Sequence, residues 1–341
     1  MLIFADSFDY YTNIGSKWIA GNGGIDLSGA QSRTGPGCML IPGGIGSTGP
    51  YKAFPAVGEI IVGGAVYPDG VCLPFSFTNI AGAGLYIENI QIGVQGDMSV
   101  GWFRGVPGGY SLIGQSAPNV CVQNAYNYIE ARVLFSTTNT GTVEIRVNGL
   151  TVFAVTGVKT TGVYVGTAFC DAVRLGGGGG VIVTRHDDFY ILDPSAPPND
   201  SFLGPVRIYA CLPWQDSAPL DWTPSVAGPH FPLVNSIPPD LTKWVESNTV
   251  GQQDLYRHDT SAIPPTIQVL GVQHNLLGAL DAPGTRGIAS VVDGIVGPIT
   301  AALSTSPAQY LTEYDVDPVT GVAWTLPLIT SPRVFGPAVT V

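Results

Sequence analysis

The chain has 341 residues, of which 45% are hydrophobic and only 11% are charged, and its formal net charge is −11. The hydrophobic share is high enough to build packed cores, which excludes a natively disordered protein. With 14 Lys and Arg against 25 Asp and Glu, the chain has no basic surface that could neutralise phosphates. We therefore expect no nucleic acid partner and no binding to anionic membranes.

Glycine and proline divide the chain into short segments. There are 45 Gly and 28 Pro residues, and no helical periodicity persists through the first half. This composition predicts an all-β fold with many turns. The N-terminal MLIFADSFDYY has no cationic leader, and no stretch of about 18 apolar residues occurs, so we expect neither a signal peptide nor membrane insertion. The five cysteines occur singly and are expected to be buried free thiols.

A proline-rich stretch at residues 194–200 separates two parts of the chain. The strand predicted at 189–192 ends there, because three prolines cannot donate backbone hydrogen bonds. We therefore predict two domains, residues 1–193 and 201–341, joined by a linker at 194–200. Similar acidic and aromatic residues open the chain and precede the linker, which indicates that the first and last strands of the first domain lie side by side.

The clearest local pattern lies between residues 129 and 155. Apolar residues alternate with charged ones in both IEARVLF and VEIRV, the period of half-buried strands. Asn148 and Gly149 then suit a type I′ turn, because both tolerate positive φ. The predicted hairpin pairs Val147 with Leu150, Ile145 with Val152 and Val143 with Ala154.

The strand at 129–135 has two alternative registers against the strand at 143–147. Val133 or Phe135 can lie opposite Val143 with the apolar faces aligned. The first alternative sets Glu130 across from Arg146 and Arg132 across from Glu144, whereas the second sets two arginines opposite each other. We predict the first, because opposite charges attract across strands.

These motifs are similar to those of a known family. The run NYIEARVLFSTTNTGTVEIRVNGLTVFAVTG, followed by DDFYILD, resembles the concanavalin A-like (laminin G-like) jelly-roll sandwich. The second half, with FLGPVRIYACLPWQDSAPLDWTPS, WVESNTVGQQDLY and APGTRGIASVV, resembles a module that follows such a sandwich in structural proteins of tailed bacteriophages. The resemblance implies an N-terminal concanavalin A-like jelly-roll sandwich followed by a smaller C-terminal β-sandwich.

The resemblance also implies a function and a location. The chain would be a non-enzymatic virion structural protein, such as a tail, fibre or capsid-attached component, made in the host cytoplasm. Its partners would be copies of itself and other virion proteins, and a trimer is expected by analogy with projecting phage appendages. The alternative is a carbohydrate-binding module that recognises host-surface glycans.

A polysaccharide hydrolase, the third reading, is disfavoured by the carboxylates. Such enzymes need two carboxyl groups about 5 to 10 Å apart. The chain has six glutamates, and no two lie within five residues of each other. Glu130 and Glu144 each precede an arginine by two residues, so we expect them in surface ion pairs. We therefore predict that the chain is not an enzyme.

Two sets of residues are candidates for binding. Clustered carboxylates can ligate Ca²⁺ through oxygen, whereas capping of strand ends and turns is the simpler role; no other cofactor is expected. Exposed aromatic rings would favour glycan or partner contact. The Ca²⁺ candidates are Asp6, Asp9, Asp187 and Asp188; the contact candidates are Trp102, Phe103, Tyr110, Trp214 and Trp222.

Overall fold

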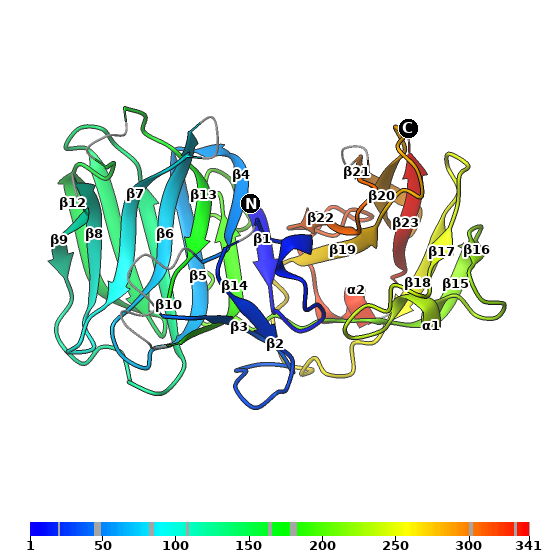
Figure 1. Cartoon of the computed structure of the whole chain (residues 1–341), viewed down its shortest axis with the longest axis horizontal. Helices are drawn as coiled ribbons and strands as arrows, with labels where there is room; N and C mark the ends of the chain where they lie inside the picture. Colours follow the sequence, from blue (N-terminus) through cyan, green and yellow to red (C-terminus); the bar gives the residue numbers. More distant parts are fainter. Residues whose placement is uncertain are drawn as a thin grey trace. The chain divides into compact units, whose positions relative to one another are not determined.

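The computed structural model describes the whole chain except residues 20, 44–48, 82–84, 107–108, 163–165, 178–182, 300–302, 331–332 and 341 (Figure 1). Strands dominate and the helices are short, so the prediction of an all-β fold is confirmed. No helix among these residues is both long and apolar enough to cross a membrane.

The chain divides into two compact units. The first comprises Met1–Phe8, Thr12–Ile14 and Trp18–Ile208, and the second comprises Asp9–Tyr11, Gly15–Lys17 and Tyr209–Val341. Residues 201–208, which the sequence analysis assigns to the second domain, thus belong to the first unit.

The first unit is a sandwich of two antiparallel sheets, which lie as two layers in Figure 1. The larger sheet has eight strands in the order β12-β11-β10-β5-β14-β3-β2, with β1 paired to β14. The other has six strands in the order β4-β13-β6-β7-β8-β9. The eight-stranded sheet contains β1 (Leu2–Asp6), β2 (Gly24–Asp26), β3 (Cys38–Ile41), β5 (Glu59–Tyr67), β10 (Asn127–Leu134), β11 (Gly141–Val147), β12 (Leu150–Val158) and β14 (Thr184–Leu192). The six-stranded sheet contains β4 (Tyr51–Val57), β6 (Cys72–Ala81), β7 (Leu85–Val94), β8 (Val100–Val106), β9 (Gly109–Gln115) and β13 (Cys170–Leu175).

Aromatic side chains fill the space between the two sheets. Phe75 of β6 packs against Phe189 of β14 with ring centroids 5.9 Å apart, and Phe77 packs against Phe135 at 6.2 Å. All four side chains are buried. The first strand pairs with the last, β1 with β14, which confirms their predicted adjacency.

The predicted register between β10 and β11 is confirmed. Val133 lies opposite Val143, and Glu130 and Arg132 lie opposite Arg146 and Glu144. The ion pairs nevertheless do not form between these cross-strand neighbours. Arg132 binds Glu59 at 2.7 Å, and Arg146 binds Glu144 of its own strand at 3.0 Å. Glu59 lies on β5, the other neighbour of β10, which the local pattern could not place.

The predicted hairpin is correct only at its turn. Asn148 and Gly149 have positive φ, and Val147 pairs with Leu150. A register shift then follows, so that Ile145 lies opposite Phe153 and Val143 opposite Val155, instead of Val152 and Ala154. A bulge of one extra residue in β12 accounts for the shift, since it moves every later side chain by one position.

The second unit is a smaller β-sandwich. A five-stranded sheet, ordered β15-β18-β23-β20-β21, packs through Ser290 and Phe335 on the pair β19-β22. Strand β15, which contains two prolines, lies at the edge of that sheet, where a missing donor costs little. The elements are β15 (Pro213–Leu220), β16 (Thr223–Pro224), α1 (Phe231–Val234), β17 (Val245–Glu246), β18 (Asp254–His258), β19 (Val272–Gly278), β20 (Gly287–Val292), β21 (Ile295–Ile299), β22 (Ala308–Tyr314), α2 (Leu326–Thr330) and β23 (Phe335–Thr340). A short 3₁₀ helix, η1 (Ile14–Ser16), lies near the N-terminus.

Candidate functional site

The outer face of the six-stranded sheet can be assigned from the strand pairing. Phe75 and Phe77 point toward the other sheet, as their ring contacts show. Ile92 lies opposite Phe75, and Trp102 lies opposite Ile92, so both share this inner face. Because side chains alternate along a strand, the intervening residues face outward.

One outward row crosses five strands of this sheet. Arg174 of β13 lies opposite Ser76, Ser76 opposite Gln91, Gln91 opposite Phe103, and Phe103 opposite Leu112 of β9. Ser76 and Gln91 are buried at the floor of the row, while Arg174 and Phe103 are half-buried and Leu112 is 44% exposed. The row therefore runs from a guanidinium through a hydroxyl and an amide to an aromatic and an aliphatic side chain.

Glycines let the apolar end of this row lie flat on the backbone. Gly93 and Gly101 pair with each other on β7 and β8. A Cβ at Gly93 would lie 2.7 Å from Cε2 of Phe103, and a Cβ at Gly101 would lie 2.7 Å from Cδ1 of Leu112. The Phe103 and Leu112 side chains thus occupy the space that a side chain at Gly93 or Gly101 would need.

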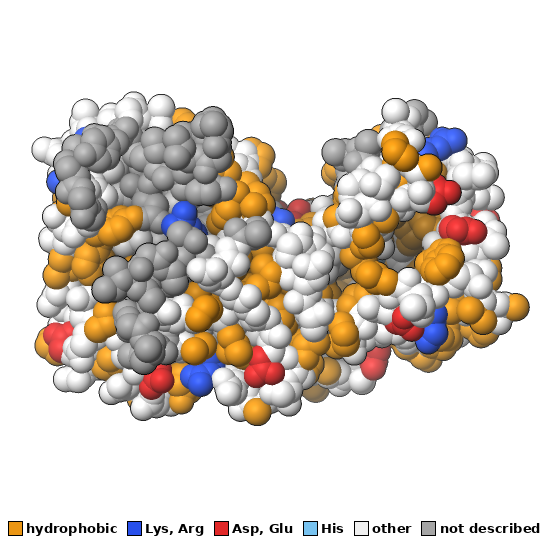
Figure 2. Space-filling model, viewed as in Figure 1, with side chains coloured by type: hydrophobic (Ala, Val, Ile, Leu, Met, Phe, Trp, Pro, Cys, Tyr) orange, Lys and Arg blue, Asp and Glu red, His pale blue; other side chains and the backbone are white. Residues whose placement is uncertain are grey.

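The predicted aromatic candidates in the first unit divide between the two faces of the sheet. Tyr110 lies opposite Gly105, on the same side as Phe103, and is 42% exposed. Trp102 faces the core and is only 1% exposed, so it offers no ring to a glycan, contrary to the hypothesis. Strand alternation separates the neighbours Trp102 and Phe103, which composition alone could not do. Hydrophobic side chains gather over β8 and β9 in Figure 2.

The two other aromatic candidates lie in the second unit. Trp214, on the edge strand β15, is 52% exposed and presents its ring to solvent. Trp222 is half-buried, and its indole N–H donates to the carbonyl of Gln252 at 3.2 Å. Trp214 is thus available for contact, whereas Trp222 anchors a connection within its own unit.

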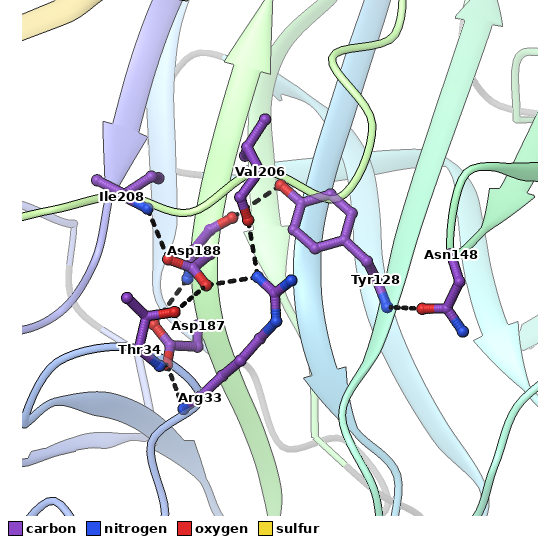
Figure 3. Close-up of polar contacts among 8 residues, drawn as sticks. All are labelled: Arg33, Thr34, Tyr128, Asn148, Asp187, Asp188, Val206 and Ile208. Atoms are coloured by element: carbon purple, nitrogen blue, oxygen red, sulfur yellow. Dashed lines mark hydrogen bonds and ion pairs between the residues drawn. The ribbon is translucent and has the colours of Figure 1, made fainter. Parts of the chain in front are cut away.

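Asp187 and Asp188 lie together in a buried network that protein donors satisfy (Figure 3). Asp187 Oδ2 accepts hydrogen bonds from the backbone N–H groups of Arg33 and Thr34, at 2.6 and 3.0 Å. Asp188 Oδ2 accepts from the guanidinium of Arg33 at 2.6 Å and from the Thr34 hydroxyl at 2.9 Å. Burial and the neighbouring Asp188 carboxylate raise the pKa of Asp187.

The other two Ca²⁺ candidates also lie in buried positions. Asp6 accepts hydrogen bonds from the Phe8 backbone at 3.0 Å and from the Trp18 indole at 2.7 Å, and Asp9 is buried. In the part of the chain that the structure describes, no three His, Cys, Asp or Glu side chains are grouped as metal ligands. Asp6, Asp187 and Asp188 thus bind donors of loops and strand ends, the role that the sequence analysis weighed against metal binding.

Glu130 is not in a surface ion pair, so that prediction is wrong. Its side chain is fully buried, and Oε1 accepts hydrogen bonds from the Tyr190 hydroxyl at 2.5 Å and the Gly204 N–H at 2.9 Å. Burial raises the pKa of Glu130. Glu144 does pair with Arg146 at a partly exposed site, as expected.

The segment that buries Glu130 is Phe202–Ile208, which we call the strap. Phe202, Leu203 and Val206 pack on an apolar cluster of the eight-stranded sheet that includes Tyr128 and Tyr190. The carbonyl of Val206 accepts from Arg33 at 2.7 Å, and the N–H of Ile208 donates to Asp188 at 2.8 Å (Figure 3). The strap therefore covers part of the outer face of that sheet.

The sequence analysis missed Ser76, Gln91 and Arg174. One signal was present: in IENIQIGV, Gln91 alternates with Ile90 and Ile92, which places an amide on the face opposite the core. Ser76 and Arg174 join it only through strand pairings between β13, β6 and β7, which no local pattern reveals.

The comparisons with known proteins add a set of weak structural similarities. No family model matches the chain, and no curated protein matches its sequence. The endo-β-1,4-glucuronan lyase of the fungus Trichoderma reesei is 16% identical, with 56% of this chain and 95% of that chain covered and a TM-score of 0.40. A PL-14 alginate lyase of Aplysia kurodai is 12% identical (56% and 99% covered, TM-score 0.42), and the carbohydrate-binding module CBM66 of Bacillus subtilis is 9% identical (52% and 96% covered, TM-score 0.34). At these identities and scores, the similarities assign neither an activity nor a ligand to this chain.

Proposed function

We propose that the first unit binds a carbohydrate on the outer face of its six-stranded sheet, at Phe103, Tyr110 and Leu112. The observation that carries the proposal is the arrangement of this face. An aromatic ring lies against a glycine, two further apolar side chains are more than 40% exposed, and polar groups continue the row. A sugar ring has apolar C–H faces and a rim of hydroxyls, and such a surface can contact both.

The polar part of the row suits recognition without chemistry. The Gln91 amide can donate and accept hydrogen bonds, as can the Ser76 hydroxyl, and the Arg174 guanidinium donates only. Ser76 and Gln91 are buried beneath the row, so of these three side chains only the half-buried Arg174 reaches its surface. We propose that the ligand is bound and released intact.

Binding to a panel of soluble polysaccharides, measured by affinity electrophoresis and calorimetry, tests the proposal. Phe103→Ala and Tyr110→Ala should each weaken binding by roughly 10-fold or more, because each removes about 1 to 3 kcal/mol of ring contact. Val122→Ala is the control, because Val122 is 61% exposed and lies outside the strands of both sheets. Binding that survives both aromatic substitutions, or the release of new sugar ends, would refute the proposal.

A second proposal concerns the setting in which the chain works. The second half resembles a module of tailed-phage structural proteins, and we propose that the second unit attaches the chain to such a particle. Exposed apolar side chains such as Trp214, Trp244 and Ile299 support an assembly surface there. Mass spectrometry of purified particles, with and without the gene for this chain, would decide whether the chain is a component.

A further inference from the structure

Two uncharged edge strands lie at the same end of the first unit. β9 and β12 are terminal strands of their sheets, and they lie side by side because the Phe153 ring packs on Gly114 (Figure 1). Neither GYSLIGQ nor LTVFAVTGV contains a charged residue or a proline. Leu150 and Ile113 at this end are exposed by 40% or more.

The opposite edges of the same two sheets are built differently. β4, at the other edge of the six-stranded sheet, carries Lys52 and Pro55, and β2, at the other edge of the eight-stranded sheet, has three residues including Asp26. Charge, proline, shortness and β-bulges are devices by which proteins prevent edge strands from pairing with another chain. Among the described edges of the sandwich, only the end formed by β9 and β12 lacks charge, proline and shortness, and the bulges of β12 leave its residues 153–156 regular.

The charge pattern inside the eight-stranded sheet strengthens this contrast. Glu59 on β5, Arg132 on β10, and Glu144 and Arg146 on β11 place charged groups on three successive strands. On β12 the partners of Glu144 and Arg146 are Ala154 and Thr151. β12, the edge strand, therefore lacks the charged side chains that would oppose its pairing with another chain.

We propose that this end is an interface with a second copy of the chain, in which β12 pairs antiparallel with β12 of the partner. An antiparallel pair of identical strands is self-complementary about a two-fold axis, so one surface supplies both sides of the interface. Register shifts at both ends of β12 leave residues 153–156 regular, and we place the two-fold axis at Ala154, which puts Ala154 opposite its copy in the partner with both side chains on one face. The eight-stranded sheets of two copies then continue into each other, and the assembly closes as a dimer instead of the trimer expected by analogy.

The oligomeric state of the full chain tests this inference independently of sugar binding. Sedimentation equilibrium should give a dimer for the native chain. Ala154→Lys should weaken dimerisation by roughly 100-fold or more, because the two-fold axis would bring two ammonium groups together at a desolvated edge. Val122→Lys, at a site 61% exposed outside any strand, should leave the dimer intact.

Other results would overturn it. A native chain that stays monomeric at all concentrations would contradict the proposed dimer. An oligomer that Ala154→Lys leaves unchanged would contradict the proposed interface. If Ala154→Lys does not fold, Thr156→Lys is the substitute variant. Amide hydrogen exchange of the native chain is a second test that needs no variant. Exchange in residues 150–158 should then slow as the protein concentration rises, and concentration-independent exchange there would contradict the interface.

Discussion

Two histidines in the core of the second unit, His274 buried and His258 half-buried, predict that this unit is sensitive to acid. The rings of His258 and His274 pack edge to face at 6.1 Å, and both contact Phe335. Nδ1 of His274 lies 2.6 Å from Ser290 Oγ, and Nδ1 of His258 is buried without a hydrogen-bond partner among the described residues. Burial lowers the pKa of His258 to about 4, and burial together with His258 lowers that of His274 to about 3.

The direction and size of the effect follow from these values. Both folded-state pKa values lie below the unfolded value of 6.5, so the stability that neutral histidines contribute is present above pH 6.5 and is lost as pH falls toward the folded values. One pKa unit corresponds to about 1.4 kcal/mol. Between pH 7 and pH 5 the unfolded chain gains protons that the folded core excludes, so each histidine lowers the free energy of unfolding by roughly 2 kcal/mol.

Urea unfolding at pH 7 and pH 5, followed by peptide-resolved hydrogen exchange, measures this loss in the second unit alone. The native chain should lose roughly 4 kcal/mol there, and His258→Phe should lose about half as much. His186→Phe is the control, since His186 lies in the first unit. Equal stability of the second unit at pH 7 and pH 5 would show that the histidines titrate normally and would refute the reasoning.

Three further predictions concern the first unit. Arg33→Leu should lower its free energy of unfolding in urea by about 3 kcal/mol or more, because Asp188 stays buried without its cation, and adding Asp188→Asn should restore much of the loss; purely additive effects would contradict this. Gly93→Ala should displace the Phe103 ring and weaken sugar binding in calorimetry at a stability cost of about 1 kcal/mol, and unchanged affinity would count against the site. Limited proteolysis should cut at the exposed residues 195–198 and leave both fragments associated, because the strap packs on the first unit; native gel filtration that separates them would disprove it.

The strand pairings that sequence could predict are those with a local cause. The Asn148-Gly149 turn and the alternation around it define β10, β11 and their register, because turn chemistry and side-chain period act over a few residues. The bulge in β12 could not be foreseen in the same way. Phe153 reaches Gly114 of β9, a contact between strands far apart in sequence that the alternation of β12 alone does not encode.

The candidate site was predictable only in part for the same reason. Phe103 and Tyr110 were identified as aromatic candidates, and the structure places both on one open face. Assigning Trp102 to the core needed the pairing of β7 with β8. Gln91, Ser76 and Arg174 form a row only because β13, distant in the chain, pairs with β6.

The strap links the misplaced Glu130 to the choice of binding face. The sequence analysis treated Glu130 as a surface residue because the strand alternation puts it on the side away from the core, and that assignment is correct as far as it goes. The strap then returns over this side. The Gly204 N–H and the Tyr190 hydroxyl donate hydrogen bonds to the Glu130 carboxylate, and the Phe202 ring centroid lies 4.0 Å from Cζ of Arg146. A face that the chain covers itself is poorly available to a ligand, whereas Tyr110 and Leu112 are exposed at the β9 end of the outer face of the six-stranded sheet. The same segment that hides one carboxylate therefore argues for the other sheet as the surface that meets a sugar.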